Sequence, residues 1–207
     1  MESKGIDGYV AAASELIPRY DAVSQSDLFS PIKRLIPNKT CRILDVGAGT
    51  GAGAAWFATH GHQVLAVEPV DAFRKAGIAR HGIRNIEWLD DMLPALTATS
   101  ERHEVFDLVL LSAVWHHLTA VQRKYAMPNL VRLIAPSGHL FVSVRNGPGA
   151  RNRPCYDAPP QELVDLAITE SLQPVLCQPA ESVQSENRAA GVTWTWLVFT
   201  KGAPLRA

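Results

Sequence analysis

A glycine-rich loop that directly follows an apolar segment constrains this chain more than any other feature. The run ILDVGAGTGAG, residues 43–53, passes one acid, Asp45, and then has glycine at every second position. Glycine adopts backbone conformations that other residues avoid, and it lets a ligand approach the main chain closely. The run therefore predicts a strand that ends at a ligand-binding turn, and it leaves open whether the ligand carries a phosphate.

Short apolar segments alternate with helical ones after this loop. We expect strands at residues 42–46, 63–68, 85–90, 105–114 and 139–145, and a helix over 119–135 with Thr119 as N-cap and Pro128 as a break or kink. Strands separated by helices favour a parallel sheet covered on both faces. Two further strands, near 174–180 and 192–201, should pair antiparallel because we expect no helix between them. The predicted fold class is α/β, a Rossmann-like, seven-stranded, mostly parallel sheet with helices on both faces and an antiparallel C-terminal strand.

Composition and charge exclude several classes of protein. Lys+Arg and Asp+Glu each number 20, so no basic surplus indicates a nucleic-acid partner, and none is expected. The apolar runs are too short to span a bilayer, and the start of the chain lacks a signal-peptide pattern. The three cysteines are widely spaced and match neither a disulfide framework nor a metal site. We expect a cytoplasmic protein with no membrane partner and no metal; the sequence leaves its oligomeric state open.

Acidic residues stand where three of the expected strands end. Asp45 beside a pyrophosphate would meet like charge, whereas beside a cationic amine or sulfonium it would be favourable. Glu68 lies about twenty residues downstream, where an acid accepts hydrogen bonds from both hydroxyls of a ribose. Of the adjacent Asp90 and Asp91, we expect one to face the ligand and one to face water. These acids predict an adenosyl ligand that carries positive charge.

The chain resembles the class I S-adenosylmethionine-dependent methyltransferase family. The resemblance covers residues 40–145 and is carried by LDVGAGTG (44–51), VEPVD (67–71), WLDDMLP (88–94), FDLVLLSAVWHHL (106–118) and LIAPSGHLFVSV (133–144). It implies S-adenosyl-L-methionine as cofactor and methyl transfer to a small-molecule acceptor by in-line displacement. AVWHHL (113–118) stands where enzymes that methylate adenine or cytosine amino groups carry an Asn/Asp-Pro-Pro-aromatic motif, which disfavours that activity.

The resemblance also implies which residues bind the cofactor. It places the loop at the methionine part, Glu68 at the ribose, an acid with Met92 at the adenine, and Ser112 near the sulfonium. The expected cofactor-binding residues are Tyr20, Asp45, Gly47, Ala48, Gly49, Gly51, Glu68, Pro69, Asp90, Asp91, Met92 and Ser112. Tyr20 either folds over the cofactor or only packs. If either histidine of the pair 116–117 acts in chemistry, His116 is the expected general base; a structural role is the favoured alternative.

We expect a single domain over residues 1–207, with an N-terminal helical cap region (1–38), a cofactor-binding core (39–145), and a substrate-side loop, helix and C-terminal hairpin (146–207). The loop 145–160 carries Arg145, Arg151 and Arg153. It forms either a lid over an acceptor, which could then be anionic, or a solvated connection. Two other functions stay open: an NAD-type oxidoreductase, and a cofactor-binding protein without turnover.

Overall fold

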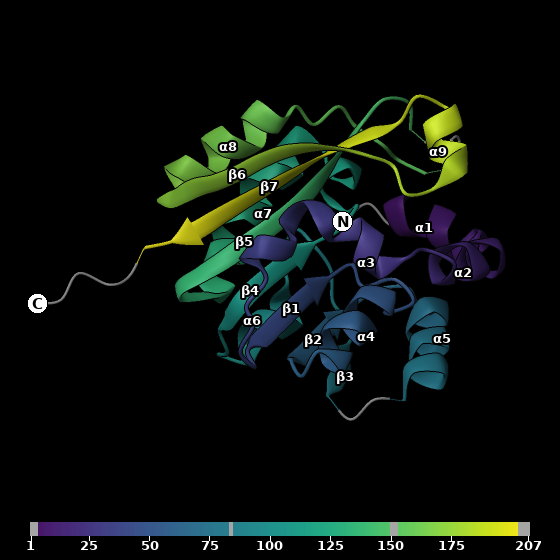
Figure 1. Cartoon of the computed structure of the whole chain (residues 1–207), viewed down its shortest axis with the longest axis horizontal. Coiled ribbons are helices and arrows are strands. Elements are labelled where there is room, and N and C mark those ends of the chain that lie inside the picture. Colours follow the sequence, from purple (N-terminus) through teal and green to yellow (C-terminus); the bar gives the residue numbers. More distant parts are fainter. Residues whose placement is uncertain (1–3, 83–84, 150–152, 203–207) are drawn as a thin grey trace, which may run out of the picture.

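The computed structural model describes residues 4–82, 85–149 and 153–202. Its centre is a sheet with the strand order β3–β2–β1–β4–β5–β7–β6 (Figure 1). The strands are β1 (Arg42–Val46), β2 (Gln63–Val67), β3 (Ile86–Leu89), β4 (Phe106–Leu111), β5 (Ile134–Asn146), β6 (Leu172–Glu181) and β7 (Thr193–Lys201). β1 to β5 pair in parallel, and β7 runs antiparallel to both β5 and β6. The predicted fold class is confirmed.

Helices cover both faces of the sheet and bury two separate apolar cores. On one face lie α7 (Ala120–Leu133) and α8 (Pro160–Thr169), which pack on β4, β5 and β7. On the other face lie α4 (Ala52–Thr59), α5 (Asp71–His81), α3 (Gln25–Leu28) and the 3-10 helix η1 (Ser30–Leu35). A parallel sheet needs this double cover because its strands are apolar on both sides.

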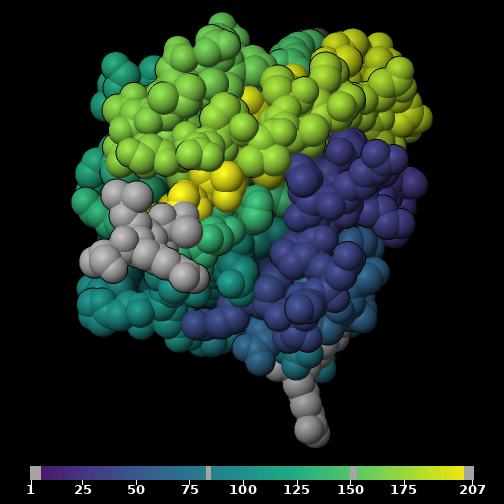
Figure 2. Space-filling view, turned by 60° about the vertical axis from the view of Figure 1, so that its left-hand side comes forward, coloured from purple at the N-terminus to yellow at the C-terminus, as the bar shows by residue number. Residues whose placement is uncertain are grey.

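The N-terminal part of the chain joins the second core through two buried side chains. Phe29 and Ile32 are each 1% exposed, and the Phe29 ring lies 5.1 Å from the ring of Phe57 and 6.1 Å from that of Trp196. In Figure 2 the indigo N-terminal residues lie directly against the yellow-green C-terminal strands. Trp196 is therefore a packing residue.

Three short helices gather at the carboxyl-end edge of the parallel strands (Figure 1). They are α1 (Lys4–Ala11), α2 (Ala13–Asp21) and α9 (Ser185–Ala189), and the 3-10 helix η2 (Trp115–His117) follows β4 at the same edge. Leu16 of α2 packs against Val70 and Phe73, which follow β2. This edge is where open α/β sheets bind ligands.

Some local predictions are confirmed and others are corrected. Thr119 caps α7 in a capping box with Gln122, as its position before the helix indicated. The helix is continuous through Pro128, so the predicted break is wrong.

β5 begins earlier than expected because Ile134 already pairs with Phe106, before an irregular step in the register. The short helix α9 lies between β6 and β7 where we expected none, yet the two strands still pair antiparallel. α6 (Thr97–Glu101) lies between β3 and β4. None of the helices in the described ranges is long and apolar enough to cross a membrane.

A buried arginine anchors the segment that leads from β5 to α8. Arg123 on α7 is 3% exposed, and its guanidinium donates to both carboxylate oxygens of Glu162, at 2.7 and 3.3 Å. It also donates to the backbone oxygens of Leu118, at 2.7 Å, and Asp157, at 2.9 Å. Four acceptors from three segments therefore meet at one side chain, which holds α8 and its preceding loop against α7.

We expect Arg123→Ala to lower the free energy of unfolding by about 3–5 kcal/mol, because it leaves Glu162 and two carbonyl oxygens without their buried donor. Urea denaturation followed by circular dichroism measures this change. Arg132→Ala removes an exposed arginine from the same helix and is the matched control, with an expected change of about 0.5 kcal/mol or less. A loss of the same size in both variants would contradict the anchoring role.

Candidate functional site

A cavity of about 950 Å³ opens at the carboxyl ends of β1, β2 and β4. The loop after β1, the ends of β2 and β3, η2 and the segment after β5 line it, together with α1, α2 and α9. Most of the predicted cofactor residues line this cavity: Tyr20, Asp45, Gly47, Ala48, Gly49, Glu68, Pro69, Asp91, Met92 and Ser112. His116 lines it as well, whereas Gly51 and Asp90 do not.

The glycines of the loop serve different purposes. Gly47, Gly49 and Gly51 have φ angles of +72°, +58° and +74°, which side chains other than glycine rarely adopt. A Cβ at Gly51 would lie 2.5 Å from the Trp88 ring, and one at Gly47 would lie 2.6 Å from a Val114 methyl group. These two glycines make room for protein side chains. A Cβ at Gly49 would lie 3.6 Å from the Tyr20 ring, an ordinary van der Waals distance, so Gly49 has the least crowded surroundings of the three glycines, and it lines the cavity.

Glu68 connects the end of β2 to the glycine loop. It is 5% exposed, and its carboxylate accepts hydrogen bonds from the backbone amides of Gly49, at 2.8 Å, and Val70, at 2.9 Å. Burial raises the pKa of Glu68, and the two amide donors oppose this rise. Glu68 therefore holds the glycine loop in place. The sequence predicted a contact of Glu68 with a ribose and did not predict this second role.

Asp45 is a buried acid without a basic partner. It is 3% exposed at the end of β1, and burial, followed by the charge of Glu68, raises its pKa to about 7. In the ranges described, neither carboxylate forms an ion pair with a lysine, arginine or histidine. Two uncompensated acids beside a glycine loop favour a ligand that brings positive charge.

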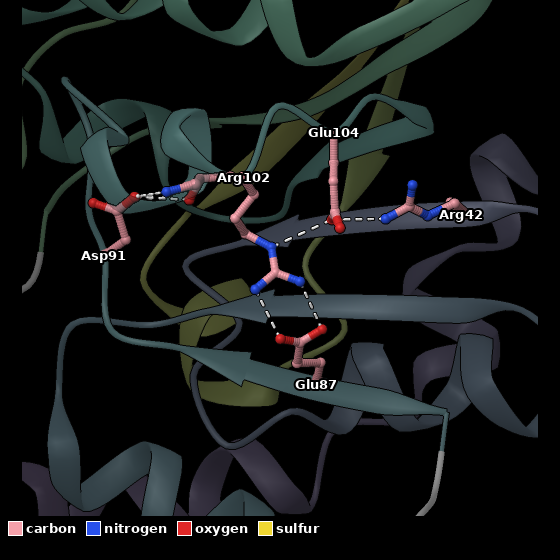
Figure 3. Close-up of polar contacts among 6 residues, drawn as sticks. Arg42, Glu87, Asp91, Arg102 and Glu104 are labelled. Carbon is pink, nitrogen blue, oxygen red and sulfur yellow. Dashed lines mark hydrogen bonds and ion pairs between the residues drawn. The ribbon is translucent and has the colours of Figure 1, made fainter.

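The adjacent Asp90 and Asp91 have separate partners. Asp90 is an exposed acid whose carboxylate accepts from Arg74 at 2.8 Å. Asp91 accepts from the backbone amide of Met92 at 2.8 Å and from both the amide and the hydroxyl of Thr99 at 2.7 Å, so it caps the start of α6. In Figure 3 this contact lies beside an ion-pair network formed by Arg42, Glu87, Arg102 and Glu104. Asp91 is thus the acid that faces the cavity, and its contact with an adenine stays a prediction.

The two histidines of η2 have different environments. His117 hydrogen-bonds through Nδ1 to the Pro154 carbonyl oxygen and through Nε2 to the Tyr9 hydroxyl, the latter at 2.6 Å. A carbonyl oxygen only accepts, so His117 carries its proton on Nδ1 and accepts from Tyr9. His116 is 3% exposed, and its Nδ1 is buried with no hydrogen-bond partner among the described residues. Burial, with the charges of His117, Arg145 and Arg153, lowers the pKa of His116 to about 2.

The segment after β5 contacts the N-terminal helices. The Arg153 guanidinium lies 5.1 Å from the centre of the Tyr9 ring and donates to the Tyr20 hydroxyl at 3.4 Å. Arg145 donates twice to the Pro148 carbonyl oxygen, at 2.7 and 3.0 Å. Arg151 lies outside the described residues. Tyr20 packs on Phe73 at 5.6 Å and also faces the cavity, so both of its predicted roles are compatible with this position.

The sequence did not indicate the roles of Tyr9, His117 and Arg123. Tyr9 and His117 are 108 positions apart, and Arg123 and Glu162 are 39 apart, so no local pattern joins them. The signal available for Arg123 was a charged residue within the apolar pattern of a helix, which is typical of a paired buried charge.

Comparison with known proteins finds similarity to methyltransferases. A profile for a methyltransferase domain matches residues 44–142. An uncharacterised methyltransferase of Bacillus pumilus is 24% identical over 138 residues, which cover 67% of this chain and 59% of that protein. An uncharacterised methyltransferase of Alkaliphilus oremlandii is 26% identical over 100 residues, which cover 48% of this chain and 44% of that protein. The chain thus spans about half the length of the curated relatives it matches.

Solved structures share the fold at low sequence identity. The 1,6-didemethyltoxoflavin-N1-methyltransferase of Burkholderia thailandensis, solved with 1,6-didemethyltoxoflavin and S-adenosylhomocysteine, superposes with a TM-score of 0.74 at 21% identity, over 95% of this chain and 86% of that one. The N-methyltransferase NodS of Bradyrhizobium japonicum, in complex with S-adenosylhomocysteine, gives 0.65 at 18% identity, over 90% and 97%.

The profile match and the shared fold agree with the resemblance to the class I S-adenosylmethionine-dependent methyltransferases that residues 40–145 carry. The predictions of the family, the enzyme class and the cofactor S-adenosylmethionine are confirmed at this level. The contacts of individual residues with the cofactor stay predictions.

The raised pKa of Asp45 predicts a pH-dependent effect of Asp45→Asn on the ligand-free protein. The folded pKa of about 7 lies above the ordinary value of 3.8, so the stabilisation of the protonated acid is complete below pH 3.8 and is lost as the pH rises through 7. Asparagine does not titrate. The variant should therefore gain stability relative to wild type as the pH rises, and above pH 7 it should have the higher melting temperature.

Melting curves recorded from about pH 4 to about pH 8 measure this difference, because the Asp45 carboxyl titrates within this range. Asp165→Asn, which changes an exposed acid on α8, is the control and should show no such gain. A pH-independent difference for Asp45→Asn would contradict the raised pKa.

Proposed function

We propose that this protein transfers the methyl group of S-adenosylmethionine to a small-molecule acceptor by in-line displacement in the cavity at the carboxyl ends of the strands. One observation carries the proposal. The same cavity contains two buried, uncompensated acids beside the glycine loop and a separate basic and aromatic region next to the segment after β5. A donor and an acceptor can therefore lie in one enclosed space.

The acidic part of the cavity fits the cofactor. A sulfonium and an ammonium group near Asp45 and Glu68 would offset the cost of burying these two carboxylates. Each Glu68 oxygen accepts one backbone amide, and a carboxylate has about four acceptor positions, so it retains capacity for ribose hydroxyls. An NAD-type ligand would bring a pyrophosphate to the same acids, which argues against the oxidoreductase alternative.

The chain contributes alignment and exclusion of water. S-adenosylmethionine supplies an already electrophilic methyl group, so the protein mainly has to place the acceptor in line with it. Tyr9, Tyr20 and Arg153 cover the cavity from the N-terminal side and from the segment after β5. This cover supports the prediction that 145–160 acts as a lid.

The environment of His116 argues against its role as a general base. A base works best when its pKa is near the working pH, and the pKa of His116 is about 2. We therefore propose that neutral His116 hydrogen-bonds to the acceptor and orients it. Its assignment as the base stays a prediction, which a pH–rate profile of His116→Gln would test.

A small acceptor is supported by the size of the site. The cavity of about 950 Å³ is shared by donor and acceptor and is covered by α1, α2 and α9. The similar N1-methyltransferase of Burkholderia thailandensis was solved with 1,6-didemethyltoxoflavin, which supports a small-molecule acceptor here. Its low sequence identity transfers the fold to this chain and leaves the particular acceptor open.

Binding of S-adenosylhomocysteine tests the cofactor site directly. It should raise the melting temperature by mass action, whereas NAD at the same concentration should leave it unchanged. Transfer of a labelled methyl group to a panel of metabolites then tests turnover. A shift with NAD alone would overturn the proposal, and binding of S-adenosylhomocysteine with no transfer to any acceptor would favour the alternative of a binding protein without turnover.

The two bonds that Glu68 accepts predict a split effect of its substitution. Glu68→Ala should weaken S-adenosylhomocysteine binding by about 1–3 kcal/mol and should also destabilise the ligand-free protein, because the Gly49 and Val70 amides lose their acceptor. Calorimetry and urea denaturation measure the two effects. Glu87→Ala, an acid outside the cavity, is the control for binding. Unchanged affinity in Glu68→Ala would remove Glu68 from the cofactor site.

A further inference from the structure

The cavity is divided by charge. Its acidic lining residues, Asp45, Glu68 and Asp91, stand at the ends of β1, β2 and β3. Arg145 and Arg153 line the other side, at the end of β5 and in the segment that follows it. Within the described ranges neither arginine forms an ion pair, although ion pairs hold Arg42, Arg74, Arg102 and Arg123 elsewhere. Two guanidinium groups thus face the cavity without an acidic partner.

Neutral groups hold both guanidiniums in place. Arg145 uses Nε and one terminal nitrogen to donate to the Pro148 carbonyl oxygen, and it lies 5.7 Å from the centre of the Trp194 ring. Arg153 rests on the Tyr9 ring and has one long contact, 3.4 Å, with the Tyr20 hydroxyl. A guanidinium has five N–H donors, so each of these arginines keeps donors for a ligand. Aromatic faces and a carbonyl fix their positions without neutralising their charge.

His116 lies in the field of the same two cations. Its pKa falls through burial first, and the charges of His117, Arg145 and Arg153 add to this fall. The ring lies 4.1 Å from that of His117 at an interplanar angle of 46° and meets Trp194 edge-on at 5.6 Å. Its buried Nδ1 has no partner among the described residues. A buried polar atom without a partner is costly, and a bound ligand that supplies one would be favoured.

We propose that the acceptor is a small planar compound with an acidic group ionised at neutral pH, and that Arg145 and Arg153 bind this anionic group while Trp194 and His116 contact its ring. This inference rests on the proposed function and adds the chemical class of the acceptor. Arginine binds planar anions such as carboxylates through two parallel N–H donors. The aromatic surfaces nearby suit a planar ring.

An ionised acceptor also agrees with the weak basicity of His116. When the acidic oxygen or nitrogen is itself methylated, its electron pair forms the bond to the methyl carbon, and the carbon–sulfur pair leaves with sulfur. The proton has then already gone to solvent, so no base is required in the site. The product has lost its negative charge, and the two arginines hold it more weakly than they hold the acceptor.

Binding of benzoate to the protein saturated with S-adenosylhomocysteine tests the inference, with benzamide as the neutral analogue of the same shape. Calorimetry should show benzoate binding that weakens with salt, and much weaker binding of benzamide. Arg153→Gln and Arg145→Gln should each lower benzoate affinity about tenfold or more, because a charge-assisted hydrogen bond is lost. Arg153→Lys, which keeps the charge, should retain part of the affinity, and Arg132→Gln should leave it unchanged.

Three results would overturn the inference: no benzoate binding at millimolar concentration, equal binding of benzoate and benzamide, or unchanged benzoate affinity in both glutamine variants. A fourth result concerns the carboxylate of the cofactor. If Arg153→Gln weakens S-adenosylhomocysteine but not 5′-methylthioadenosine, which lacks that carboxylate, and leaves benzoate affinity unchanged, the arginine serves the cofactor. Failure of the proposed function is distinct, since wild-type protein would then not bind S-adenosylhomocysteine at all.

Discussion

Two carboxylates, Asp45 and Glu68, are buried at adjacent strand ends, and the site depends on this constraint. Among the described residues, neither carboxylate forms an ion pair with a lysine, arginine or histidine. Parallel pairing of β1 with β2 brings Asp45 and the residue after β2, Glu68, to one edge of the sheet. Glu68 then binds the Gly49 amide, so the conformation of the glycine loop and the charge of the cavity have the same origin. The ligand-free protein carries an electrostatic cost at neutral pH that a cationic ligand relieves. The fold thereby favours the binding of a cationic ligand at these two carboxylates.

Local patterns predicted much of the fold, because the interactions that decide strands, helices and caps are close in sequence. Thr119 and Gln122, three positions apart, form a capping box. The apolar strand segments predict a sheet covered on both faces. The site was less predictable where distant segments meet. The space beside Gly51 is filled by Trp88, and Asp91 caps a helix in addition to facing the cavity. Such contacts between distant segments have no signature in the neighbouring residues.

The division of the cavity into an acidic and a basic part explains how one enclosed space can bind two unlike molecules. The cationic donor is attracted to the strand ends, and an anionic acceptor is attracted to Arg145 and Arg153. Each molecule placed in the wrong half would meet like charge. If the proposed anionic atom is the one that is methylated, the reaction joins a cation with an anion, and both products then have less electrostatic attraction to the protein than the reactants have.

His117 joins two parts of the chain that both cover the cavity. Its ring hydrogen-bonds through Nε2 to the Tyr9 hydroxyl on α1 and through Nδ1 to the Pro154 carbonyl oxygen in the segment after β5. If α1 or the segment after β5 moves away, the imidazole loses one of its two hydrogen bonds, and a polar ring nitrogen is left without a partner. One imidazole therefore ties α1 to the segment after β5 at the cavity, so a shift of either segment changes a hydrogen bond of the same ring.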